Sequence, residues 1–140
     1  MRVILDTNVL LGALISPHRP PDLIYRAWRS ARFDLVTSTI QLEEMRRVSR
    51  YPKLRAILPA HRVGAIINNM QRAIVLEELP PIPETLGIHD LNDVFLVSMA
   101  LAGDADFLIT GDRKAGLLQQ GHIGRTRVLT PAIFCKEKLF

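Results

Sequence analysis

Acidic residues are scarce in this chain of 140 residues, and some of them stand where a carboxylate can do chemistry. The sequence holds 14 Asp and Glu against 18 Lys and Arg. Asp6 directly follows the apolar run Val3–Leu5, and Asp112 follows the apolar run Phe107–Ile109 after two residues. If both runs are parallel strands, both acids lie at carboxyl ends, where the crevice of an α/β sheet forms.

A third acid comes from a helix that is predicted to begin near Ser38. Its apolar face is made by Ile40, Leu42, Met45 and Val48. At 100° per residue, Glu43 points away from this face, whereas Glu44 lies on its flank, roughly 70° from the centre. A carboxylate at the flank of a buried face needs a partner, so we choose Glu44 over Glu43.

Asp90 and Asp93 begin an apolar segment that continues to Ala102. Their spacing of three places both on one side of the predicted helix. Each acid also has a simpler structural interpretation. Asp6 and Asp112 suit a turn or a helix cap, Asp90 suits an N-cap, and Asp93 suits the positive end of the helix dipole.

The remaining simple interpretation pairs Glu44 with Arg46 or Arg47 on the surface. The simple interpretations would, however, all have to be true at the same time. Four carboxylates that converge on one crevice would repel one another. A hard divalent cation removes that repulsion, and Mg²⁺ prefers oxygen ligands. The acids therefore predict a metal site.

Five short apolar runs and the helical segments between them indicate the elements that must position these acids. The predicted strands are Val3–Leu5, Phe33–Val36, Ile74–Leu76, Phe107–Ile109 and Val128–Leu129. Helical spacing of apolar residues occurs at 23–28, 63–70 and 90–102. Strands that alternate with helices predict a three-layer α/β/α domain around a mostly parallel sheet of about five strands.

Composition restricts the class of protein further. The length suits one domain, 1–140, because domains usually take about 100–200 residues. A hydrophobic share of 48% and a charged share of 23% exclude a disordered chain. One cysteine, Cys135, excludes an internal disulfide. No signal-peptide pattern and no membrane-spanning run is visible, so we expect a cytoplasmic protein.

An ordered set of motifs resembles the PIN domain family. The motifs are Asp6-Thr7-Asn8, Glu44 before an apolar residue, Asp93-Val94-Phe95-Leu96, Thr110-Gly111-Asp112 and the closing segment 129–134. The similarity covers nearly the whole chain. It is closest to the stand-alone PIN proteins that are grouped as toxins of VapC type.

This resemblance implies an endoribonuclease that depends on Mg²⁺ or Mn²⁺, often a homodimer inhibited by a small antitoxin protein. It implies that the catalytic and metal-binding acids are Asp6, Glu44, Asp93 and Asp112. Asn8 and Thr110 match supporting polar positions, and Asp90 is a secondary candidate.

A basic stretch suits an RNA partner. No acidic residue occurs from Met45 to Leu76, and the candidate RNA-binding residues are Arg46, Arg47, Arg50, Lys53 and Arg55. A cationic surface beside an acidic crevice suits a polyanion backbone. A solvated helix face is the simpler alternative for these residues.

Two other functions remain open at this point. One is a DNA nuclease that uses the same carboxylate chemistry on particular DNA structures. The other is a non-catalytic module with a PIN fold that binds nucleic acid or protein. The absence of a glycine-rich phosphate-binding motif disfavours a nucleotide-dependent enzyme.

Overall fold

The computed structural model describes residues 1–88, 90–111 and 116–140, with residues 85 and 92 described by their backbone alone. Within these ranges, the central sheet has six strands in the order β3-β2-β1-β4-β6-β5. The strands are β1 (Arg2–Leu5), β2 (Asp34–Ser38), β3 (Ile74–Leu76), β4 (Phe107–Ile109), β5 (His122–Ile123) and β6 (Thr126–Leu129). All neighbouring pairs are parallel except β5 and β6. The predicted mostly parallel α/β sheet is confirmed.

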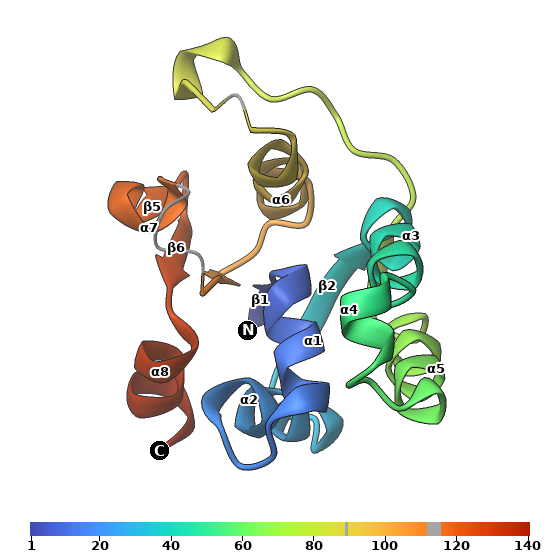
Figure 1. Ribbon diagram of the computed structural model, residues 1–140. Helices are drawn as coiled ribbons and strands as arrows, with labels where there is room; N and C mark the ends of the chain where they lie inside the picture. The colour runs from blue at the N-terminus through green and yellow to red at the C-terminus, as the bar shows by residue number, and fades with distance from the viewer. Residues whose placement is uncertain (89, 112–115) are drawn as a thin grey trace.

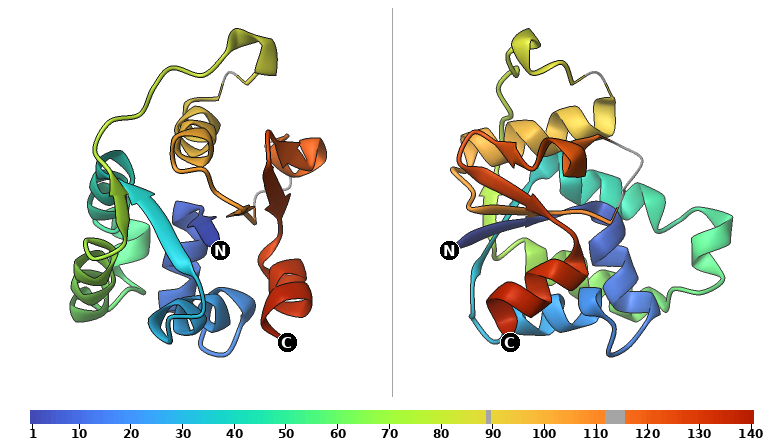
Figure 2. Two further views of the ribbon diagram at one scale, coloured as in Figure 1. Left: turned by 180° about the vertical axis from the view of Figure 1, so that it is seen from behind. Right: turned by 90° about the vertical axis from the view of Figure 1, so that its left-hand side faces the viewer.

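Helices cover both faces of the sheet (Figures 1 and 2). They are α1 (Thr7–Ile15), α2 (Pro20–Arg29), α3 (Thr39–Val48), α4 (Pro52–Arg55), α5 (Ala60–Met70), α6 (Leu91–Ala102), α7 (Leu117–Gln120) and α8 (Pro131–Phe134). A 3₁₀ turn, η1 (Glu84–Leu86), precedes α6, and a π-helical turn, η2 (Cys135–Leu139), follows α8. Every described helix is too short or too polar to cross a lipid bilayer.

Two hydrophobic clusters lie on the two faces of the sheet. Consecutive side chains of β1 alternate between them, as strand geometry requires: Val3 and Leu5 join one cluster, and Ile4 joins the other. The first cluster is packed by α1, α2, α3, α5 and α8, and the second by α6 and α7. Because both faces are covered, the centres of β1 and β2 are apolar on both sides, and the polar residues Arg2, Asp34 and Ser38 stand at strand ends.

Helix α6 has a fixed direction relative to the sheet. Arg2 Nη1 donates a hydrogen bond of 2.9 Å to the carbonyl oxygen of Gly103, which ties the end of α6 to the start of β1. Gly103 allows this close approach, since a Cβ there would stand 2.8 Å from Val36 Cγ1 and 2.9 Å from the Met99 carbonyl oxygen. The first turn of α6 therefore lies at the carboxyl ends of the strands, as the right-hand view of Figure 2 shows.

Several features differ from the sequence expectations. Strand β2 covers Asp34–Ser38 where Phe33–Val36 was expected, and β6 covers Thr126–Leu129 where Val128–Leu129 was expected. Strand β5 was not predicted, because two residues joined to β6 through Gly124 at φ 57° give no periodic signal. The apolar face assigned to α3 was wrong at one position: Ile40 is 44% exposed, whereas Gln41 is buried at 1%. Gln41 occupies a core position because its amide has hydrogen-bond partners there, described below.

Candidate active site

Asp6 lies at the junction of β1 and α1 and does two things at once. Its backbone N–H donates to the Ile109 carbonyl oxygen at 2.9 Å, which continues the pairing of β1 with β4. Its Oδ1 atom accepts from the Asn8 backbone N–H at 3.4 Å, so the residue caps α1. The capping interpretation of Asp6 is thus correct, and it leaves the half-buried carboxylate at the carboxyl end of the central strand.

Thr110 holds the second oxygen of this carboxylate. Its Oγ1 atom donates a hydrogen bond of 2.8 Å to Asp6 Oδ2. Thr110 is 2% exposed, and its own backbone N–H donates to the Leu129 carbonyl oxygen at 3.0 Å. Because the sheet fixes the backbone of Thr110, the hydroxyl can orient the Asp6 carboxylate. The family resemblance implies a supporting role for Thr110, and that role stays a prediction.

Glu44 is carried on a helix that is anchored to the end of β1. Ser38 caps α3 by accepting from the Gln41 backbone N–H at 3.1 Å. The Gln41 side chain then bridges two strand ends: its Nε2 donates to the Leu5 carbonyl oxygen at 2.7 Å, and its Oε1 accepts from Thr37 Oγ1 at 2.7 Å. Glu44 lies one turn farther along the same side of α3.

The burial of the two adjacent glutamates differs as the sequence predicts. Glu44 is half-buried and Glu43 is exposed. In the part of the chain that the structure describes, Glu44 forms no ion pair, so a surface pair with Arg46 or Arg47 is not supported. The choice of Glu44 as the site acid stays a prediction.

Asp90 and Asp93 stand at the start of α6. The Asp93 backbone N–H donates to Asp90 Oδ1 at 3.4 Å, and the Val94 N–H donates to the Asp90 carbonyl oxygen at 2.8 Å. Asp90 is exposed and matches the capping interpretation. Asp93 is half-buried in the first turn of α6. Figure 2 shows that this turn and the beginning of α1 lie at the same end of the sheet.

The fourth predicted acid, Asp112, lies outside the described residues. Across residues 1–88, 90–111 and 116–140, no group of three or more His, Cys, Asp or Glu side chains is placed to hold a metal ion. The chemistry of the described donors still suits a hard cation, because Asp6, Asp93 and Glu44 offer only oxygen and Mg²⁺ is usually held by one or two carboxylates with water.

Thr7, the residue after Asp6, carries a buried hydroxyl. Thr7 is 2% exposed, and its Oγ1 atom has no hydrogen-bond partner among the described residues. A buried hydroxyl without a partner costs about 1–3 kcal/mol, so water or a ligand is expected to satisfy it. Sequence reasoning missed both Thr7 and Gln41; a polar residue at the inward position of a helix was the available signal for Gln41.

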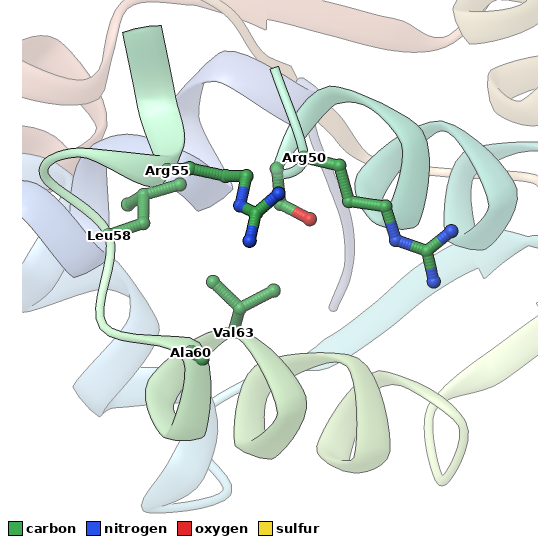
Figure 3. A pocket seen from close by; sticks show the side chains of 6 residues that line it. Arg50, Arg55, Leu58, Ala60 and Val63 are labelled. Atoms are coloured by element: carbon green, nitrogen blue, oxygen red, sulfur yellow. The ribbon is translucent and has the colours of Figure 1, made fainter. Parts of the chain in front are cut away.

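The basic residues extend from the end of α3 across α4. Arg47, Arg50, Lys53 and Arg55 are exposed, and Arg46 is half-buried. Arg50, Arg55, Leu58 and Val63 are among the residues that line a cavity of about 510 Å³ between α3, α4 and α5. Figure 3 shows the Arg55 guanidinium over this cavity, near Val63, while that of Arg50 points away from it.

A family model described as the PIN domain matches residues 2–114. The chain belongs to the PIN domain family. The resemblance inferred from the sequence motifs is thereby confirmed, and the matched segment includes all four predicted acids.

A solved structure shows that the fold is shared beyond the sequence motifs. A chain in the crystal structure of VapBC2 from Rickettsia felis, bound to a DNA fragment from their promoter, superposes with a TM-score of 0.58. The two chains are 20% identical, and the match covers 93% of this chain and 98% of the other. No curated protein sequence matches the chain.

Proposed function

We propose that this PIN-domain chain is a metal-dependent endoribonuclease, the toxin of a toxin–antitoxin pair of VapC type. One observation supports the proposal most strongly. Asp6 is placed at the carboxyl end of the central strand and held there by the Thr110 hydroxyl, although α1 needs only one of its two carboxylate oxygens as a cap. A carboxylate oriented by a neighbouring hydroxyl is typical of a metal ligand with its supporting partner.

Asp6 and Asp93 are the proposed principal ligands of Mg²⁺ or Mn²⁺, with Glu44 and Asp112 completing the site or holding water. A divalent cation supplies a nucleophilic water at neutral pH and neutralises charge that develops on the phosphate. The protein's own part is to position the oxygens. Thr110 orients Asp6, Gln41 anchors the helix that carries Glu44, and Asp90 caps the helix that carries Asp93.

RNA is the proposed substrate because a basic surface adjoins the acids through one helix. Glu44 and Arg47 lie on the same helix, α3. The exposed residue Arg50 follows on the segment that leads to α4, and Lys53 and Arg55 lie in α4 itself. These side chains are free to contact successive phosphates of a single strand. Binding is then expected to weaken as salt rises, since counterions are released from the backbone.

An antitoxin partner is proposed from the similar structure, which is a VapBC2 complex. A homodimer remains a prediction from the family resemblance. The apolar stripes of α2 and α5 cover the sheet, because Ile24, Ile66 and Met70 are completely buried. A partner must therefore use other surfaces or the exposed flanks of these helices.

Calorimetric titration with Mn²⁺, followed by digestion assays, tests this function. An active nuclease should bind the cation and cut single-stranded RNA in preference to flapped DNA. Negligible binding would favour the non-catalytic module, and a preference for flapped DNA would favour the DNA nuclease. A Lys136→Gln variant is a matched control, because Lys136 is exposed on η2 at the C-terminal end of the chain.

A further inference from the structure

A second cavity lies beside the beginning of α1, the helix that Asp6 caps. It has a volume of about 330 Å³ and is lined by Asn8, Val9, Pro21, Gly111 and Pro131. These residues come from the beginnings of α1, α2 and α8 and from the segment after β4. A cavity of this size lies at the lower end of the range that holds small ligands.

Two walls of the cavity are connected to Asp6 by hydrogen bonds. On one wall, the Asn8 backbone N–H lies 3.4 Å from Asp6 Oδ1. On the other, Gly111 directly follows Thr110, whose hydroxyl lies 2.8 Å from Asp6 Oδ2. A group bound in the cavity therefore contacts residues that lie within two positions of Asp6 or next to Thr110 in the chain.

The lining favours a flat apolar group over a phosphate. Pro21 and Pro131 stand in the first turns of α2 and α8, and proline has no N–H with which to bind an anion there. Val9 is 3% exposed and adds an apolar surface. A lining of apolar walls with a few polar groups is typical of sites that bind an organic ring.

Asn8 supplies the polar group. The residue is exposed, and its side-chain amide makes no hydrogen bond to the described residues. An asparagine amide offers one donor and one acceptor in a plane, which matches the N6 and N7 atoms of adenine. Unpaired RNA bases are commonly read by apolar contact with their faces and hydrogen bonds to their edges.

We propose that this cavity binds an unpaired base, preferentially adenine, of the nucleotide next to the cleaved phosphodiester. The inference rests on the proposed ribonuclease function and adds the feature that selects the cut position. Pro21 and Pro131 contact the faces of the base, and Asn8 reads its edge.

Cleavage of a single-stranded RNA pool with every base at each position tests the proposal in the presence of Mg²⁺. Wild type should prefer adenine beside the cut. Asn8→Ala should reduce that preference by roughly tenfold, as expected for the loss of a bidentate contact. Pro21→Ala should weaken the preference at the same position, whereas Pro20→Ala, a change in the same helical turn outside the lining, should keep the wild-type profile.

A binding measurement separates the failure of this inference from that of the function. In a chelator, adenosine 5′-monophosphate should give saturable shifts in the NMR signals of Asn8, Val9 and Gly111, and uridine 5′-monophosphate should bind at least about fivefold more weakly. If RNA is not cut but these shifts appear, the proposed nuclease function is wrong, whereas the proposed base-binding site is supported. An unchanged cleavage profile in Asn8→Ala, or an absence of these shifts, overturns the base site.

Discussion

The Thr110 hydroxyl donates a 2.8 Å hydrogen bond to the Asp6 carboxylate across 104 positions of sequence. The bond joins the ends of two adjacent parallel strands, β1 and β4, whose register pairs Leu5 with Ile109. The two side chains can meet because Asp6 and Thr110 are each the first residue after their strand. The pairing of β1 with β4 therefore determines how close Asp6 and Thr110 lie to each other.

Thr110→Val should impair the site without unfolding the protein. The variant keeps the shape of the side chain but removes the hydroxyl from Asp6, and loss of such a supporting partner typically costs 10–100-fold in metal affinity or activity, so we expect roughly that loss. Thr110→Ser, which keeps the hydroxyl, should retain most of the wild-type metal affinity and activity. Mn²⁺ titration and RNA cleavage rates measure the effect; equal affinity in Thr110→Val and wild type would show that the bond does not orient a ligand.

Glu44→Gln and Glu43→Gln form a matched pair. If Glu44 faces the site, its neutral variant should lose roughly tenfold or more in cleavage rate, by analogy with the loss of a metal partner. Glu43 is exposed on the other side of the helix, so its variant should keep the wild-type rate. Initial rates under saturating Mg²⁺ decide between them, and the reverse order of effects would assign the role to Glu43.

Gln41→Ala should destabilise the fold. It leaves the Leu5 carbonyl and the Thr37 hydroxyl without their buried partners, which we expect to cost about 2–4 kcal/mol in the free energy of unfolding. Glu43→Ala on the same helix should change that free energy by no more than about 0.5 kcal/mol. Urea denaturation provides the measurement. Similar midpoints for both variants would mean that the bridge contributes little.

Arg50→Gln and Arg55→Gln should lower the salt dependence of RNA binding. If each arginine contacts one phosphate, each variant should reduce the slope of log K against log salt concentration by about 0.7, the value for single strands. Lys136→Gln should leave the slope unchanged. Fluorescence anisotropy at several salt concentrations measures it, and unaltered slopes in both arginine variants would favour a merely solvated helix face.

Burial raises the pKa of the Cys135 thiol, whose side chain packs near the Pro20 carbonyl oxygen. The thiol should therefore react slowly with iodoacetamide in the native protein and rapidly in denaturant. Because the unfolded chain ionises first, the thiol's contribution to stability is present at lower pH and is lost as pH rises above the ordinary thiol value. Alkylation rates that are equal in both states would contradict the burial of the thiol.

The sequence predicted the fold well because the centres of the strands are short runs made mainly of apolar residues. Phe107–Ile109 and Ile74–Leu76 were predicted with their observed bounds. The same reasoning could not find Gln41 as an internal bridge, since its role depends on where the end of β1 meets α3 in space. The cavity beside Asn8 was also beyond reach, because it is formed by helix ends that only the tertiary structure brings together.

Digestion of single-stranded RNA, with Mg²⁺ and then with excess chelator, most directly tests the claim that carboxylates and a divalent cation cut RNA here. Wild type should cut only with the metal. Asp93→Asn should be inactive in both conditions while it keeps the wild-type circular dichroism spectrum. Full cleavage by Asp93→Asn, or undiminished cleavage by wild type in the chelator, would contradict the account.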